Sequence, residues 1–91
     1  IMSSVIIIGG GASGFFTAIR LAELNPNLTI TILEKTSKVL SKVAISGGGR
    51  CNITNGQPKE KEFLENYPRG NEFLSSAFKK FNNKDVIEWF K

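Results

Sequence analysis

The stretch that decides the fold is VIIIGGGASG, residues 5–14. Its first four residues are β-branched and apolar, which is typical of a parallel strand buried on both faces. The glycines that follow let the chain turn sharply, because glycine adopts positive φ without a steric penalty. Residues 12–24 then repeat apolar and small side chains at helical spacing. The stretch therefore predicts a strand, a tight turn and a helix in direct succession.

A second strand follows the helix. Asn25-Pro26-Asn27 ends the helix, because proline cannot continue it and disfavours helical geometry at the residue before it. Residues 28–33 alternate threonine with isoleucine and leucine, as strands do. The sequence predicts the α/β class, with a Rossmann-like βαβ unit over residues 4–34 and helices after it.

The glycines of the turn have the spacing of a dinucleotide-binding fingerprint, Gly9-x-Gly11-x-x-Gly14. In that fingerprint the first glycine makes the turn, the second leaves room for a diphosphate, and the third lets helix and strand pack closely. Backbone N–H groups around Ala12 and Ser13, at the start of the helix, are expected to face the phosphates. The alternative is a glycine-rich turn without a ligand.

Glu34 stands 20 residues after Gly14, at the end of the second predicted strand. A carboxylate at that place accepts hydrogen bonds from the ribose hydroxyls of adenosine. It also repels a 2′-phosphate, which disfavours NADP, although Lys35 beside it weakens this argument. At this point the pattern leaves NAD and FAD open, and a Glu34 that merely faces solvent is the alternative.

The basic charge is concentrated next to the glycine turn. The chain has a formal net charge of +4, and residues 35–50 contain Lys35, Lys38, Lys42 and Arg50 without any acid. This clustering indicates a local anion site rather than a broad nucleic-acid surface, so a basic nucleic-acid-binding module is the weaker alternative. No apolar run approaches the roughly 18 residues that cross a membrane. With a single cysteine, the composition favours the cytoplasm.

The remaining residues predict a loop and several helices. Residues 35–45 are short and basic, with one or two helical turns expected, and 46–56 are too rich in glycine and asparagine for a long regular element. Helices are expected at residues 59–66, 71–81 and 83–91, the last capped by Asn82 or Asn83. Aromatic residues recur on these helices and are expected to form core, namely Phe73, Phe78, Phe81, Trp89 and Phe90.

The segment Ser46-Gly-Gly-Gly-Arg-Cys-Asn-Ile-Thr-Asn55, read with the fingerprint and Glu34-Lys35, resembles the aminoacetone-oxidase-like (BaiN/YhiN-type) family of bacterial FAD-binding flavoproteins. Residues 66–70 and 85–90 are also similar to that family, so the resemblance covers nearly the whole chain. Leu40 departs from it, because many members have glycine there. The resemblance implies that FAD, not NAD, is the cofactor. It also implies that this chain is the N-terminal fragment of a larger, split FAD-binding domain whose remainder is absent here.

Within that resemblance, residues 46–56 form a loop close to the flavin. Three glycines allow the backbone to approach a flat ring, and Arg50 can pair with a phosphate or an electron-rich flavin edge. The alternatives are a surface loop with a solvated Arg50, an exposed Lys42, an Asn52 that only caps a helix, and a Cys51 that is a small buried side chain. The residues expected to bind the cofactor are Gly9, Gly11, Ala12, Ser13, Gly14, Glu34, Lys35, Lys42, Ser46, Gly47, Gly48, Gly49, Arg50, Cys51 and Asn52.

The resulting hypothesis is an FAD-dependent flavoprotein oxidoreductase in which a C–H bond of a small-molecule substrate gives hydride to the flavin, and the reduced flavin passes electrons to oxygen or another acceptor. No residue of this segment is expected to be catalytic or to bind a metal, since it has no histidine. Its expected partners are the substrate and the remaining segments of the same polypeptide, with no nucleic acid and no membrane. An NAD-binding dehydrogenase domain is the main alternative, but it leaves the 46–55 motif without a role.

Overall fold

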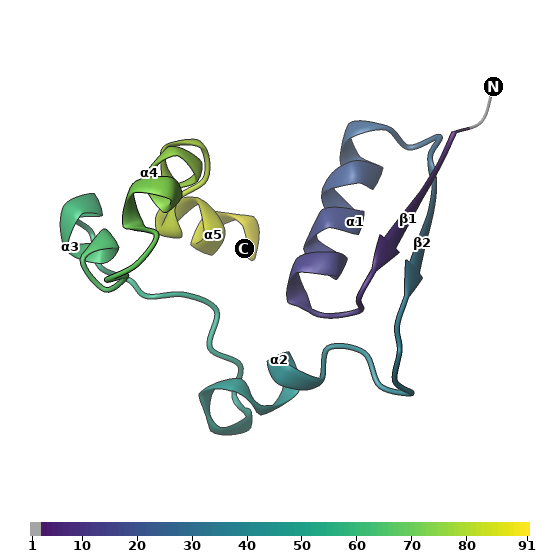
Figure 1. Ribbon diagram of the computed structural model, residues 1–91, viewed down its shortest axis with the longest axis horizontal. Coiled ribbons are helices and arrows are strands. Elements are labelled where there is room, and N and C mark those ends of the chain that lie inside the picture. The colour runs from purple at the N-terminus through teal and green to yellow at the C-terminus, as the bar shows by residue number, and fades with distance from the viewer. Residues whose placement is uncertain (1–2) are drawn as a thin grey trace. The chain divides into compact units, whose positions relative to one another are not determined.

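The computed structural model describes residues 3–91. They form two compact units, one extending through Asn52 and the other from Ile53 to Lys91. The first unit carries the sheet and the second is made of helices, and each is described by itself (Figure 1).

The first unit begins with the predicted βαβ arrangement, which the structure confirms. Strand β1 spans Ser4–Ile8, helix α1 spans Ala12–Leu24, and strand β2 spans Thr29–Leu33. The two strands pair in parallel, from Ser4 opposite Thr29 to Ile8 opposite Leu33. The glycine turn therefore lies at the carboxyl end of β1, beside the end of β2 (Figure 1).

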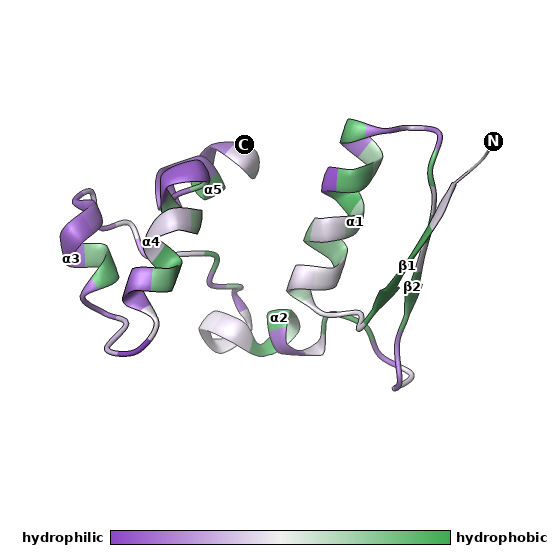
Figure 2. Ribbon diagram, turned by 45° about the horizontal axis from the view of Figure 1, so that its top comes forward, coloured by the Kyte–Doolittle hydropathy of each residue, from purple (hydrophilic) through white to green (hydrophobic). Residues whose placement is uncertain are grey.

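The sheet is covered on one face only within the described residues. Val5 and Ile7 are half-buried and alternate with Ile6 and Ile8, which are 62% and 80% exposed. Ile7 faces α1, because its Cγ2 atom lies 3.5 Å from the position that a Cβ of Gly14 would take. The two-sided burial expected for β1 is therefore not found among these residues: α1 covers one face, and Ile6 and Ile8 are exposed on the other. Figure 2 shows the hydrophobic colouring of β1.

A short connecting segment follows β2. Helix α2 spans Ser41–Ile45, and a single 3₁₀ turn, η1, follows it at Ser46–Gly49. Residues 35–45 thus contain one short helix, as expected. Leu40 precedes α2 in the left-handed conformation, with φ of 54°, which is costly for a residue with a Cβ.

The second unit contains three helices in the ranges expected from the sequence, each shorter than its range. Asn82, rather than Asn83, caps the last of them: its side chain accepts from the Asp85 N–H, and the Asp85 carboxylate accepts from the Asn82 N–H. This reciprocal pair satisfies two N–H groups that a helix start leaves open. The helices are α3 at Glu60–Leu64, α4 at Asn71–Lys80 and α5 at Asn83–Trp89.

Aromatic packing forms the small core of the second unit. The rings of Phe63 and Phe78 stack with centroids 4.6 Å apart, and both side chains are buried. Asn83 is also buried, and its amide donates to the carbonyl oxygens of Asn55 and Gln57, each at 2.8 Å. Of the aromatic residues expected as core, Phe78 is buried, whereas Phe73 and Phe90 are 85% and 55% exposed because nothing covers that face within this unit.

Candidate functional site

The glycine turn joins the sheet directly to the start of α1. The Gly9 N–H donates to the Leu33 carbonyl at 2.7 Å, which extends the pairing of the strands by one residue. Gly9 then takes φ of 107° and turns the chain. Gly14 is buried, and a Cβ there would collide with the Gly9 carbonyl oxygen. Close packing of helix against turn therefore requires glycine at position 14.

The outer side of the turn is open. A Cβ added at Gly9 or Gly11 would meet no atom within 4 Å. No side chain caps the start of α1, and Ala12 and Ser13 are exposed there. The first N–H groups of a helix have no partner within it and attract anions. The turn thus offers open space and N–H donors where the fingerprint expects a diphosphate.

Gly10 is a structural residue of this site that the spacing argument missed. It is buried, its N–H donates to Oε1 of Glu34 at 2.9 Å, and its carbonyl accepts from the Leu40 N–H at 2.8 Å. A Cβ at Gly10 would lie 3.0 Å from Cγ1 of Val39, so the segment after β2 packs against the turn. The available signal was a glycine in the middle of three, at a position that the fingerprint leaves free.

Glu34 is held by hydrogen bonds from both sides of its carboxylate. Besides Gly10 on Oε1, the Thr36 N–H and the Thr36 hydroxyl donate to Oε2 at 2.8 and 2.9 Å. The backbone N–H groups of Thr36 and Gly10 and then the Thr36 hydroxyl lower the pKa of Glu34 below its ordinary value of 4.5, against a small opposing effect of burial. Glu34 is therefore an ionised acceptor beside the turn at neutral pH.

The loop from Ser46 to Asn52 is organised around Ser46. Its carbonyl accepts from the Cys51 N–H at 2.9 Å. Its hydroxyl donates to the Val43 carbonyl at 2.9 Å and accepts from the Asn52 N–H at 3.1 Å. These bonds close the loop into a small ring that begins at the end of α2.

The backbone of this loop is largely left-handed. Gly47, Gly48 and Gly49 have φ of 59°, 66° and 90°, and Cys51 has φ of 63°. The Cys51 side chain is exposed, so the alternative of a small buried cysteine is wrong. Asn52 does not cap a helix, because the next one begins at Glu60.

The structure thus brings the expected residues together in two groups with α2 between them. Gly9, Gly11, Gly14 and Glu34 belong to the group at the ends of the strands, and Ser46–Asn52 form the other. Helix α2 connects them, since Leu40 is bonded to Gly10 at its start and Ser46 follows its end. The basic side chains Lys35, Lys42 and Arg50 are exposed.

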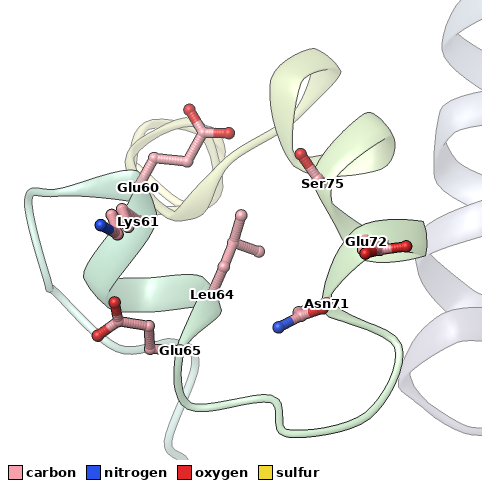
Figure 3. Close-up of a pocket in the computed structure, with 7 residues that line it drawn as sticks. All are labelled: Glu60, Lys61, Leu64, Glu65, Asn71, Glu72 and Ser75. Carbon is pink, nitrogen blue, oxygen red and sulfur yellow. The ribbon is translucent and has the colours of Figure 1, made fainter.

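The second unit has an open hollow between α3 and α4 that contains none of the expected cofactor residues. Figure 3 shows Leu64 pointing between the two helices, with carboxylates around the rim. The hollow is lined by Glu60, Lys61, Leu64, Glu65, Asn71, Glu72 and Ser75.

Among residues 3–91, no group of histidine, cysteine and acidic side chains is arranged to hold a metal. No helix of the same range is both long and apolar enough to cross a membrane.

Comparison with known proteins gives a family match over almost the whole chain. The family described as HI0933-like protein Rossmann domain matches residues 3–91. The ribosomal RNA dihydrouridine synthase of Haemophilus influenzae is 38% identical over 85 residues, which are 93% of this chain and 20% of that protein. The 3-dehydro-bile acid delta(4,6)-reductase of Clostridium scindens is 34% identical over 89 residues, 98% of this chain and 21% of that protein.

The chain is also similar to a protein whose name identifies it as a flavoprotein. The fumarate reductase flavoprotein subunit of Mycobacterium tuberculosis is 30% identical over 87 residues, 96% of this chain and 14% of that protein. No solved structure matches the chain significantly. The chain spans about a fifth of the length of the first two relatives.

Proposed function

Because the chain belongs to the HI0933-like Rossmann domain family, we propose that it is the N-terminal part of an FAD-dependent oxidoreductase. The observation that carries the proposal is the bond from the Gly10 N–H to Glu34. This bond holds an acidic side chain next to an open glycine turn. The acidic side chain is the group expected for the adenosine ribose, and the turn is the group expected for the diphosphate. The narrower assignment to the aminoacetone-oxidase-like type stays a prediction.

The residues of the turn fit the adenosine end of the cofactor. Gly9 and Gly11 leave space beside the backbone, where any side chain would project toward the phosphates. The N–H groups at Ala12 and Ser13 would donate to the diphosphate, and Glu34 would accept from the ribose. The ionised Glu34 also disfavours a 2′-phosphate, which supports an unphosphorylated ribose.

The loop from Ser46 to Asn52 would serve the flavin end. Its consecutive glycines keep side chains away from a flat ring, and the exposed Arg50 would supply positive charge. Bound FAD supplies hydride transfer at its ring, and a positive charge nearby favours the reduced, anionic ring. The part of this chain is to bind the cofactor, orient it and tune its charge. Lys35, Lys42, Cys51 and Asn52 stay in the predicted site on sequence grounds.

The names of the relatives favour a reduction as the reaction. A dihydrouridine is a uridine with two hydrogens added across a ring double bond, and fumarate reductase and delta(4,6)-reductase are also named for the reduction of carbon–carbon double bonds. We infer that the full protein adds hydrogen across a double bond conjugated to a carbonyl group. The reduced flavin would give hydride to one carbon, a proton would go to the other, and a separate electron donor would reduce the flavin again. This direction is opposite to the one expected from the sequence, in which a substrate C–H bond gives hydride to the flavin.

The cofactor proposal is tested with the full-length protein. We expect purified protein to be yellow and to release FAD on denaturation, identified by mass spectrometry of the supernatant. Release of FMN would mean that the adenosine-binding residues have another role. A colourless protein that binds NAD would overturn the proposal in favour of a dehydrogenase domain.

Ribosomal RNA is a second candidate substrate, in contrast to the expectation of no nucleic acid. The observation that favours it is the 38% identity to a ribosomal RNA dihydrouridine synthase. The test is mass spectrometry of nucleosides from the ribosomal RNA of a strain without the gene. Loss of dihydrouridine, restored by the intact gene, would support RNA. Unchanged dihydrouridine would leave a small conjugated carbonyl compound as the substrate class.

A further inference from the structure

The main-chain pairing of the sheet ends at Gly9, the first residue of the site. The Gly9 N–H still donates to a main-chain carbonyl, that of Leu33. The next N–H, that of Gly10, donates instead to the side chain of Glu34, 24 positions away. The Glu34 carboxylate therefore continues the hydrogen bonding of the sheet by one residue and fixes the turn. Its orientation decides where both the turn and the ribose-binding oxygens lie.

Glu34 has little acceptor capacity to spare in this arrangement. A carboxylate offers about four lone-pair sites. Gly10 occupies one on Oε1, and the N–H and hydroxyl of Thr36 occupy two on Oε2. About one site is then left for the ribose, whose two hydroxyls both need an acceptor. One of the present donors has to give way if both hydroxyls bind.

The Thr36 hydroxyl is the donor that can give way. Its oxygen lies 2.9 Å from Oε2 of Glu34 and also 2.9 Å from the Lys38 carbonyl oxygen. A hydroxyl has one hydrogen, so it donates to only one of these acceptors at a time. The ionised carboxylate is the stronger acceptor, because charge-assisted hydrogen bonds are stronger than neutral ones. The hydrogen therefore points to Glu34 until another donor arrives there.

We propose that Thr36 is a positioning residue for the ribose-binding carboxylate. Its hydroxyl holds Glu34 toward Gly10 while the site is empty, and turns to the Lys38 carbonyl when a ribose hydroxyl takes its place on Oε2. The exchange needs rotation of a single hydrogen, since both acceptors are already within bonding distance. The Thr36 N–H keeps its own bond to Oε2 throughout. This inference rests on the proposed function, because it assumes an adenosine ligand.

The experiment measures ligand binding to full-length protein from which the cofactor has been removed. Thr36→Val keeps the shape of the side chain and removes the hydroxyl that orients Glu34 in the empty site. We expect FAD affinity to fall roughly three- to tenfold, because the ligand must then order the carboxylate itself. Thr36→Ser restores the hydroxyl and should bind as the wild type does. Ser37→Ala, at an exposed neighbouring hydroxyl, is the matched control and should change nothing.

A second measurement separates positioning from general structural damage. The probes are ADP and 2′-deoxy-ADP, which differ by one ribose hydroxyl, and each is measured as a competitor of FAD. We expect Thr36→Val to weaken ADP more than 2′-deoxy-ADP, so that discrimination between them shrinks. Equal weakening of both would overturn the proposal, as would FAD binding that is unchanged or tighter. Thr36→Ala replaces the valine variant if the latter does not fold.

The failure of this inference is distinguishable from failure of the proposed function. Wild-type protein that does not bind FAD overturns the function. Wild-type protein that binds FAD with the same affinity as Thr36→Val overturns only the role of Thr36.

Discussion

The glycine turn and the Ser46–Asn52 loop are both rich in glycine, but different parts of the chain hold them. The turn is bonded to partners far away in sequence, namely Leu33, Glu34 and Leu40. The loop is bonded to its own neighbours, through Ser46 to Val43, Cys51 and Asn52. Tertiary structure thus fixes the turn, whereas local sequence fixes the loop.

We therefore expect the two halves of the proposed cofactor site to respond differently to mutation. Among the described residues of the first unit, the buried ones are Gly10 and Gly14, and both belong to the glycine turn. A change there alters the packing of α1 on the sheet. The loop is exposed over most of its length, so a change there should leave the sheet intact.

The largest effect is expected for Gly14→Ala. The new Cβ would collide with the Gly9 carbonyl oxygen, so α1 would have to move off the turn. Overpacking of this kind costs about 1–3 kcal/mol of unfolding free energy. The first measurement is the midpoint temperature of thermal unfolding of full-length protein without cofactor. The second is the FAD content of the protein as purified. Both should be lower than in the wild type.

Gly11→Ala is the matched control for this variant. A Cβ at Gly11 meets no atom within 4 Å, so the stability of the cofactor-free protein should change little. FAD affinity should nevertheless fall roughly 10- to 100-fold, because the methyl group would occupy the space meant for the diphosphate. Equal destabilisation by the two variants would contradict the difference between a packed and an open side of the turn.

A smaller, local effect is expected for Ser46→Ala. The variant loses the hydroxyl that bonds both Val43 and Asn52, which costs about 1 kcal/mol of local stability. Hydrogen exchange should quicken about fivefold at the Asn52 amide. The Gly9 and Gly10 amides should keep their wild-type rates, because tertiary partners hold them. Faster exchange at the turn as well would show that the two regions are coupled through α2.

The charge on Glu34 gives a third comparison, in which pH acts on the turn but not on the loop. Because hydrogen bonds lower the pKa of Glu34 in the folded protein, its contribution to stability is fully present above 4.5. It is lost as pH falls below that value, through the lowered pKa. The measurement is the stability of wild type against Glu34→Gln across this acid range. The difference between them should shrink as the pH falls, and a constant difference would contradict the assignment.

Much of the βαβ unit could be predicted from sequence, because its signals are local. The β-branched run of β1, the glycine spacing and Asn25-Pro26-Asn27 each act on the residues beside them. The position of Glu34 at the end of β2 follows from the same periodicities. Membership of a Rossmann-domain family could likewise be expected from these signals. The aminoacetone-oxidase-like type, which the 46–55 motif suggested, stays a prediction.

What sequence reasoning missed depends on contacts between distant residues. Gly10 matters because Val39 and Glu34 lie close around it, and the run of three glycines does not say which distant residues these are. The two-sided burial expected for β1 failed because burial depends on what covers a strand, and α1 covers one face. A buried Cys51 was the alternative that rested on the average behaviour of cysteine, but the side chain is exposed.

The smallest effect is expected for Leu40→Gly, at the point where the turn and α2 meet. Leu40 has φ of 54°, a conformation that costs a residue with a Cβ about 1–2 kcal/mol relative to glycine. Glycine removes that cost but adds about 0.4–1 kcal/mol of chain entropy to the unfolded state and loses a half-buried side chain. These terms nearly cancel, so the unfolding free energy should change by less than about 0.5 kcal/mol. Val43→Gly, at a half-buried position inside α2 with no such backbone strain to relieve, should be clearly more destabilising in the same chemical denaturation experiment. If Leu40→Gly lowers the unfolding free energy as much as Val43→Gly does, the Leu40 side chain holds the segment against the turn. The bond from the Leu40 N–H to Gly10 is then not sufficient to do so.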